Sequence, residues 1–155
     1  MEICEVLSQD RVIIELKNKN KIKVIKEILE VATTSGKIRD EEKLLGSILE
    51  REELKTTGVG FGLAIAHAKT DVVEGVVLSL GISKDGVSYD SLDGKPAHII
   101  FLLTASKDKN TEYLSVLAKI ARIFMEEDFR EAVKHAGSSA DVMTLIRQRE
   151  ERQYR

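Results

Sequence analysis

The chain has 155 residues, of which 43% are hydrophobic and 32% charged, and its formal net charge at pH 7 is −2. This length suits a single globular domain over residues 1–155, and the composition excludes a disordered chain. The near-neutral charge gives no reason to expect binding to nucleic acid or to a membrane surface.

A cytoplasmic location is expected from three features. The single cysteine, Cys4, excludes an internal disulfide and a CxxC metal pair. Residues 1–16 carry acidic side chains and do not resemble a signal peptide. No apolar run approaches the length that a bilayer requires, so no direct membrane insertion is expected.

The first third of the chain predicts a short strand and two helices. Residues 12–14 are β-branched, which favours a strand. Asp40 is the expected N-cap of the second helix. The first helix should follow Asn20 and stop at Gly36, with an apolar face of Ile22, Ile25, Ile28, Leu29 and Ala32, and the second should bury Leu44, Leu45, Ile48 and Leu49.

The middle of the chain predicts three strands, over residues 62–68, 72–80 and 97–104. Asp85-Gly86 and Asp93-Gly94 are typical turn signals between the second and the third. Residues 98–104, HIIFLLT, are apolar on both alternating faces, which indicates a central strand covered on both sides.

The last third predicts helices again. The first has an apolar stripe of Leu114, Leu117, Ala118, Ala121 and Phe124. The next has one of Phe129, Ala132, Val133 and Ala136, closed by Gly137. Ser138 or Ser139 can cap a final helix with Val142, Leu145 and Ile146. Helices before and after a block of strands predict an α/β fold, with a mixed β-sheet flanked by α-helices on both faces in one layered domain.

The candidate functional residues lie in one segment, residues 51–69, REELKTTGVGFGLAIAHAK. Three alternate glycines, Gly58, Gly60 and Gly62, allow a backbone to approach a small anion. If the following run is a strand, His67 lies at its C-terminal end. An imidazole with the ordinary pKa of about 6.5 is largely neutral at pH 7 and can attack phosphorus. Arg51 could bind the phosphoryl group.

The same residues also allow a simpler interpretation. His67 could be a structural histidine, Arg51 could pair with one of the many acidic side chains, and the glycines could form only a turn. The glycine spacing matches neither the P-loop nor the dinucleotide fingerprint. The residues alone leave these alternatives open.

The segment resembles the active-site region of the enzyme IIA domains of the fructose/mannitol class of the bacterial phosphoenolpyruvate:sugar phosphotransferase system. The nitrogen-regulatory enzyme IIA proteins belong to the same class. Residues 93–103 and the leucine-rich helix at 114–124 extend the resemblance over nearly the whole chain. The matching positions of the active-site block are Arg51-Glu52, Thr57-Gly58-Val59-Gly60, Gly62-Leu63-Ala64-Ile65 and His67.

The resemblance implies a phosphotransferase component with a phosphohistidine intermediate. His67 would receive the group from an HPr-like phosphocarrier protein and pass it to a cysteine of an enzyme IIB. Arg51 would stabilise the phosphate, and no metal or organic cofactor is implied. The phosphate loop would consist of Thr57, Gly58, Gly60 and Gly62. Two alternatives are a regulatory binding protein of the nitrogen-regulatory type, switched by phosphorylation of His67, and a degenerate member that is never phosphorylated.

Two positions depart from the family pattern. Ala66 replaces the proline before the active histidine, which restores an N–H and frees the backbone. Tyr113 occupies the position of the family's second histidine. A phenol can donate a hydrogen bond to phosphate, but its pKa near 10 prevents a proton shuttle at neutral pH. We therefore expect His67 to accept the group and onward transfer to be slower.

The remaining histidines, His98 and His135, are expected to be structural or surface residues. The three histidines have no spacing that argues for a metal site.

Overall fold

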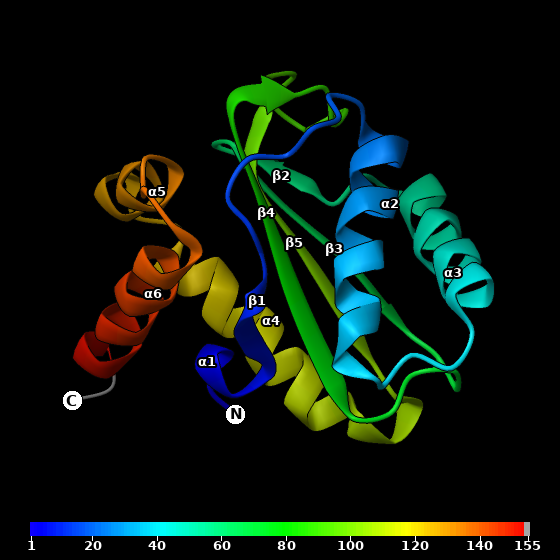
Figure 1. Cartoon of the computed structure of the whole chain (residues 1–155). Helices are drawn as coiled ribbons and strands as arrows, with labels where there is room; N and C mark the ends of the chain where they lie inside the picture. Colours follow the sequence, from blue (N-terminus) through cyan, green and yellow to red (C-terminus); the bar gives the residue numbers. More distant parts are fainter. Residues whose placement is uncertain (154–155) are drawn as a thin grey trace.

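The computed structural model describes residues 1–153. Within them, one five-stranded sheet has the order β1-β4-β5-β3-β2 (Figure 1). The β1–β4 and β3–β5 pairs are parallel, and the β4–β5 and β2–β3 pairs are antiparallel. The strands are β1 (Leu7–Ile13), β2 (Gly58–Gly60), β3 (Leu63–Lys69), β4 (Val76–Val87) and β5 (Ala97–Ala105). The sheet is therefore mixed, as predicted, and the strand predicted to be central, β5, lies at its centre.

Helices cover both faces of the sheet (Figure 1). Two short 3-10 helices, at Thr33–Ser35 and Lys107–Lys109, follow α2 and precede α4. The α-helices are α1 (Ile3–Val6), α2 (Lys21–Ala32), α3 (Glu41–Leu54), α4 (Asn110–Ile123), α5 (Glu127–Lys134) and α6 (Ser139–Gln153).

The caps predicted at Asp40 and Ser138 are confirmed, and Asn20 is a further cap that the sequence analysis did not predict. The Asn20 side chain accepts a hydrogen bond from the Lys23 N–H, and Asp40 accepts one from the Lys43 N–H. Ser138 does the same for Asp141 at the start of α6. These side chains satisfy N–H groups that have no partner within the helix, so each marks where its helix begins.

The alternation of side chains along β3 separates two hydrophobic cores. Ala64, Ala66 and Ala68 belong to the core that includes α2 and α3. Leu63 and Ile65 belong to the core on the other face, which includes α1, α4, α5 and α6. Successive side chains of a strand point to opposite faces, and the small alanines allow α3 to approach this strand closely.

The strand predicted at 72–80 is shifted in the structure. β4 begins at Val76 and continues to Val87, so Asp85-Gly86 lies within the strand instead of forming a hairpin turn. Gly86 has a φ of 97°, and the register with β5 shifts between Ile82 and Val87. A bulge can therefore use the residues that also favour a turn. Asp93-Gly94 forms the predicted turn, in which the Gly94 N–H donates to the Ser91 carbonyl.

The predicted apolar stripe of α4 is wrong at three of its five positions, whereas Phe124 is buried and Leu117 packs against the core. Leu114 is 51% exposed, and Ala118 and Ala121 are also exposed. The helix instead buries Tyr113, Val116, Ile120 and Ile123 against the sheet. Both stripes have helical spacing, and packing against the sheet selects the one with the larger side chains. Similarly, Ile22 of α2 and Ala132 of α5 are exposed, whereas Val24 of α2 is buried.

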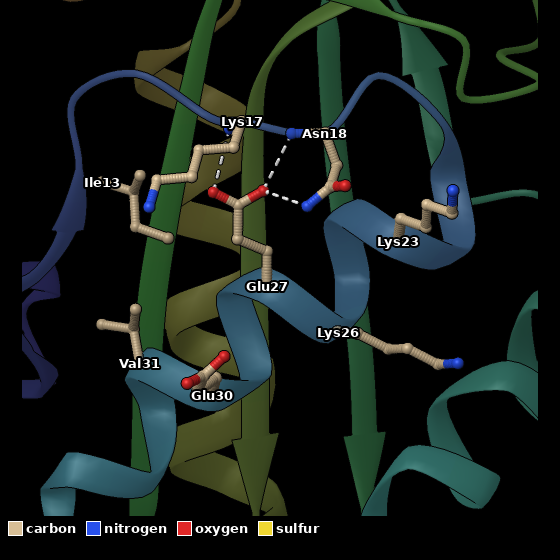
Figure 2. Close-up of a pocket in the computed structure, with 8 residues that line it drawn as sticks. All are labelled: Ile13, Lys17, Asn18, Lys23, Lys26, Glu27, Glu30 and Val31. Atoms are coloured by element: carbon tan, nitrogen blue, oxygen red, sulfur yellow. Dashed lines mark hydrogen bonds between the residues drawn. The ribbon is translucent and has the colours of Figure 1, made fainter.

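An open groove of about 550 Å³ lies between α2 and the segment that follows β1 (Figure 2). Within it, the Glu27 carboxylate accepts hydrogen bonds from the backbone N–H groups of Lys17, at 3.0 Å, and Asn18, at 3.1 Å. Glu27 therefore holds the β1–α2 connection against the helix. The groove lies at the β1 edge, and β4 and β5 separate β1 from β3, which contains His67.

Two glycines give opposite predictions for stability. A Cβ at Gly81 would lie 2.7 Å from Leu16 Cδ2 and 2.9 Å from Ile28 Cδ1, in a buried region. We expect Gly81→Ala to lower the free energy of unfolding by about 1–3 kcal/mol. Gly46 lies in α3, and no atom lies within 4 Å of a Cβ added there. Gly46→Ala should therefore raise the free energy of unfolding by about 0.5–1 kcal/mol. Urea unfolding monitored by circular dichroism measures the free energy of unfolding of both variants. Equal changes in the two variants would contradict the prediction.

Candidate functional site

His67 lies near the C-terminal end of β3, on the face covered by α4. Its Nδ1 atom is 2.7 Å from the backbone carbonyl oxygen of Ile65. A carbonyl can only accept, so Nδ1 carries the proton, and the Nε2 atom keeps its lone pair. The ring of Tyr113, in the first turn of α4, has its centroid 6.0 Å from the centroid of the imidazole. The half-buried imidazole therefore has a defined tautomer, with the free lone pair on Nε2.

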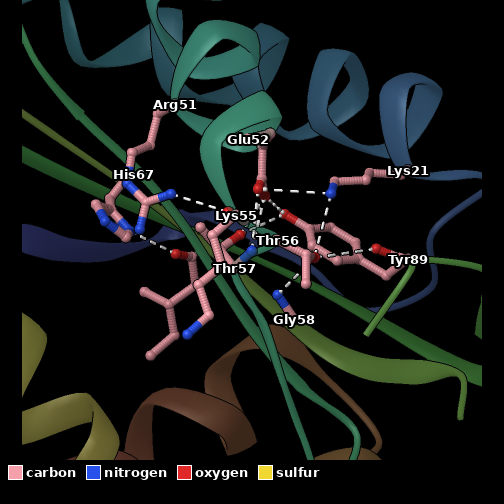
Figure 3. A network of polar contacts seen from close by, with 10 residues as sticks. Lys21, Arg51, Glu52, Lys55, Thr56, Thr57, Gly58, His67 and Tyr89 are labelled. Carbon is pink, nitrogen blue, oxygen red and sulfur yellow. Dashed lines mark hydrogen bonds and ion pairs between the residues drawn. The ribbon is translucent and has the colours of Figure 1, made fainter. Parts of the chain in front are cut away.

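Arg51 reaches the same imidazole from α3, which packs on the opposite face of the sheet. The paired β2–β3 register extends only to Gly58 and Ala64, with one further hydrogen bond from the Ile65 N–H to the Thr57 carbonyl. Beyond this point β2 no longer covers the edge of β3. Figure 3 shows the Arg51 guanidinium beside His67 at this open edge, donating to the Lys55 carbonyl at 2.9 Å.

The alternative partner of Arg51 that the sequence allowed was an acidic side chain. Within residues 1–153, no salt bridge joins Arg51 to a carboxylate. Its hydrogen bond goes to a backbone carbonyl at the end of α3, so the charge of the guanidinium is not neutralised by that partner. The guanidinium therefore remains a cation close enough to His67 to affect its pKa.

Burial is the main cause that lowers the pKa of His67 below its ordinary value, and the positive charge of Arg51 adds to it. The hydrogen bond to Ile65 and the charge of Glu52 act in the opposite direction. A lowered pKa keeps the imidazole neutral at pH 7. Burial also raises the pKa of the Tyr113 phenol to about 12, although Arg51 opposes this shift. Tyr113 therefore remains protonated and can only donate or accept a hydrogen bond.

Gly60 and Gly62 do not lie beside His67. They form the β2–β3 hairpin together with Phe61, and all three have a positive φ, of 103°, 57° and 77° in chain order. The Asp93 carboxylate holds this tip by accepting a hydrogen bond from the Phe61 N–H at 3.0 Å. His67 lies five positions after Gly62 along the strand, which is roughly 16 Å at about 3.3 Å per residue.

Of the four residues of the expected phosphate loop, Thr57 lies nearest in the fold to His67. Its carbonyl oxygen accepts a hydrogen bond from the Ile65 N–H, at 3.1 Å, two residues before His67. Gly58 pairs with Ala64, and a Cβ there would lie 2.5 Å from Ser91 Oγ. The glycine at 58 therefore permits close packing of β2 against the segment around Ser91.

A buried polar network next to these residues was not predicted from the sequence (Figure 3). Its centre is Glu52, a residue that is only 8% exposed. The carboxylate accepts hydrogen bonds from the Thr57 N–H at 3.0 Å, from the Tyr89 hydroxyl at 2.8 Å and from the Thr57 hydroxyl. Lys21 Nζ lies 3.6 Å from the same carboxylate. Glu52 follows Ile48 by four residues, and this helical spacing could have indicated that it faces inward.

The two departures at residues 66 and 113 have different structural settings. Ala66 lies in the middle of β3 with an unbroken register to β5, so the absence of a proline leaves the strand regular. Tyr113 is buried and adjacent to His67, and Lys69 Nζ lies 5.4 Å from the centre of its ring. The structure therefore brings Tyr113 next to His67.

The other candidate groups are not part of this site. His98 Nδ1 lies 2.9 Å from the Ser83 carbonyl oxygen, and the exposed His135 lies 3.2 Å from the Glu131 carboxylate. Burial raises the pKa of the Cys4 thiol to about 12, which makes it a poor nucleophile.

Residues 1–153 contain no group of three side chains suited to hold a metal ion. None of the helices in this range combines the length and the apolar character needed to cross a membrane.

Comparisons with known proteins identify similar sequences. The family model described as "Phosphoenolpyruvate-dependent sugar phosphotransferase system, EIIA 2" matches residues 5–149. The "PTS system fructose-specific EIIABC component" of Bacillus subtilis is 36% identical over 148 residues, which are 96% of this chain and 23% of that protein. The chain thus spans about a quarter of that relative. The "PTS system fructose-specific EIIA component" of Haloferax volcanii is 35% identical over 119 residues, 77% of each chain.

A solved structure shares the fold. The nitrogen regulatory protein IIA-Ntr of Neisseria meningitidis superposes with a TM-score of 0.84 at 25% sequence identity. The match covers 93% of this chain and 98% of that one. The arrangement of helices on both faces of the mixed sheet is therefore the arrangement found in that protein.

Removal of the Arg51 charge should change the titration of His67. We expect Arg51→Met to raise the pKa of His67 toward its ordinary value of about 6.5, since the guanidinium disfavours the imidazolium. A pH titration of the ring resonances by NMR measures this shift. Arg39→Met, at the other end of α3, is the control. An unchanged pKa in the Arg51 variant would show that the guanidinium does not act on the imidazole.

The same pKa has a consequence for stability. The folded-state pKa of His67 lies below the unfolded value, so the unfolded chain binds more protons in this range. The contribution of His67 to stability is therefore present above about pH 6.5 and is lost as the pH falls through the folded-state pKa.

Proposed function

Because the chain belongs to the EIIA 2 family of the phosphoenolpyruvate-dependent sugar phosphotransferase system, we propose that it carries a phosphoryl group on His67 between two protein partners. Phosphoryl transfer is the function that this membership assigns to the domain. The observation that supports His67 as the acceptor is its bond from Nδ1 to the Ile65 carbonyl oxygen. This bond leaves the Nε2 lone pair free, and the lowered pKa keeps it unprotonated.

The transfer step needs no metal or organic cofactor. Nε2 of His67 attacks the phosphorus of a phosphohistidine on the donor protein. The new N–P bond forms as the donor N–P bond breaks, and the electron pair returns to the donor imidazole. The proton stays on Nδ1 and keeps its hydrogen bond to the Ile65 carbonyl. Arg51 stabilises the charge of the phosphoryl oxygens, and the open edge of β3 gives both proteins access.

The proposed donor is an HPr-like phosphocarrier protein, and the proposed acceptor is a cysteine of an enzyme IIB, both in the cytoplasm. The name of the Bacillus subtilis relative, EIIABC, places a B unit in the same protein as the part similar to this chain. A IIB partner is therefore the expected destination of the group. Both partners need the same imidazole, so they should compete for the surface around His67.

A regulatory role is the second candidate function. The Neisseria meningitidis protein, named a nitrogen regulatory protein, matches over nearly its whole length. In a regulatory protein of this kind, phosphorylation of His67 would act as a switch. A phosphoryl group adds nearly two negative charges, which attract some partners and repel others. Phosphorylation of His67 is common to both roles, so it is the step to test first.

We expect a single acid-labile phosphoryl adduct on the wild-type chain after incubation with phosphoenolpyruvate, enzyme I and HPr, measured as intact mass. His67→Ala should abolish the adduct, while His98→Ala, which alters a histidine outside the site, should retain it. An adduct that persists in His67→Ala would contradict the assignment. A wild-type chain without an adduct from either the sugar-branch or the nitrogen-branch carrier would indicate a degenerate binding domain.

The tyrosine beside His67 should limit onward transfer. A phenol with a pKa of about 12 cannot exchange a proton at neutral pH, whereas an imidazole can. We expect Tyr113→His to leave acceptance unchanged and to speed donation to an enzyme IIB by at least about tenfold. Quenched-flow transfer from the purified phosphoprotein gives the rate. Tyr113→Phe keeps the ring and removes the hydroxyl; equal donation rates for all three proteins would show that residue 113 does not limit transfer.

A further inference from the structure

The β2–β3 pairing is incomplete at one residue pair, and this irregularity lies next to His67. Gly58 pairs with Ala64, so the neighbouring pair is Thr57 with Ile65. The Ile65 N–H donates to the Thr57 carbonyl at 3.1 Å. In an antiparallel ladder, the two residues of such a pair exchange both hydrogen bonds. The second bond would run from the Thr57 N–H to the Ile65 carbonyl.

The Thr57 N–H takes a different acceptor. It donates to the Glu52 carboxylate, at 3.0 Å from one oxygen and 3.4 Å from the other. A hydrogen bond to a carboxylate is roughly twice as strong as one between neutral groups. Lys21, Tyr89 and the Thr57 hydroxyl hold the carboxylate in place. Glu52 therefore competes successfully with the Ile65 carbonyl for this N–H.

The Ile65 carbonyl, which receives no hydrogen bond from the Thr57 N–H, is the acceptor for His67. The Ile65 oxygen lies 2.7 Å from Nδ1 of the imidazole. A carbonyl oxygen can accept two hydrogen bonds, but a Thr57 N–H on this oxygen would compete with the imidazole for it and weaken the bond from Nδ1. A histidine side chain without such a restraint favours the tautomer with the proton on Nε2, which has no lone pair there for attack on phosphorus.

We propose that Glu52 is a positioning residue that sets the tautomer and orientation of His67 by keeping the Thr57 N–H away from the Ile65 carbonyl. Glu52 does not touch the reacting atoms. It acts through two backbone groups, the Thr57 N–H and the Ile65 carbonyl. The kinetic part of this inference rests on the proposed role of His67 as the phosphoryl acceptor, whereas the structural part concerns the tautomer alone.

The test is Glu52→Met, which keeps a side chain of similar length and removes the acceptor. Long-range ¹H–¹⁵N correlation spectra above the pKa of His67 report its tautomer directly. The wild type should show the Nδ1–H form, and Glu52→Met should shift the population toward the Nε2–H form. Phosphorylation should slow by roughly tenfold, a typical cost of losing a group that orients a histidine, with an unchanged KM for the carrier.

Two matched variants separate positioning from general destabilisation. Tyr89→Phe removes a hydroxyl donor from the same buried carboxylate but leaves the bond from the Thr57 N–H. It should lower stability without changing the tautomer. Glu52→Gln keeps an oxygen that can accept from the Thr57 N–H and should restore the Nδ1–H form. A tautomer shift of equal size in Tyr89→Phe and Glu52→Met would overturn the proposal.

A measurement on the wild type keeps the proposal testable if Glu52→Met does not fold. Scalar couplings across hydrogen bonds should join the Thr57 ¹⁵N to the Glu52 carboxylate carbon and not to the Ile65 carbonyl carbon. The reverse pattern would overturn the proposal, as would an unchanged tautomer in folded Glu52→Met. A shifted tautomer with an unchanged rate would disprove the kinetic step. If the wild type forms no phosphoryl adduct, the proposed function fails while the tautomer result still decides the structural part.

Discussion

The late start of β2, at Gly58, is the constraint on which the site depends. β2 pairs only with Leu63 and Ala64, near the start of β3. The edge of β3 at His67 is therefore not covered by a neighbouring strand on this side. The imidazole lies on the α4 face, yet Arg51 can reach it from the helix on the opposite face. A full-length β2 would place a strand between the two side chains. The same open edge allows another protein to approach Nε2.

The buried Glu52 network explains why β2 begins no earlier than Gly58. The carboxylate at the end of α3 takes the Thr57 N–H and the Tyr89 hydroxyl, and Lys21 of α2 lies beside it. A buried charge of this kind contributes little net stability, because its desolvation offsets its interactions. The network instead fixes the local geometry. It joins α2 and α3 to the start of β2, and it removes the Thr57 N–H from the β2–β3 ladder. We regard this network as part of the site, although none of its members is a phosphoryl acceptor.

The environment of His67 combines a low-polarity setting with one nearby cation. Burial and Arg51 lower the pKa of His67, and burial raises that of Tyr113. The first effect favours a nucleophile at neutral pH, and the second removes residue 113 as an acid or base. The two aromatic rings thus have different chemical roles despite a centroid distance of only 6.0 Å.

Sequence patterns predicted the layered fold better than its detailed packing. The cap at Asp40 and the central position of β5 were confirmed, since they depend on local hydrogen bonding and on hydrophobic content. Three residues of the stripe predicted for α4, Leu114, Ala118 and Ala121, are exposed, because two stripes have helical spacing and only contact with the sheet distinguishes them. Asp85-Gly86 proved to lie within β4, because glycine serves in bulges as well as in turns.

The sequence by itself determined the family, the mixed α/β architecture and the likeness of residues 51–69 to a phosphohistidine segment. Only the tertiary structure decided which of those residues meet. It placed Arg51 and Tyr113 at His67, and it placed Gly60 and Gly62 at the far end of the same strand. The physical reason is that a strand extends by about 3.3 Å per residue, so neighbours in sequence separate quickly. Residues from facing helices approach one another only through packing on the sheet.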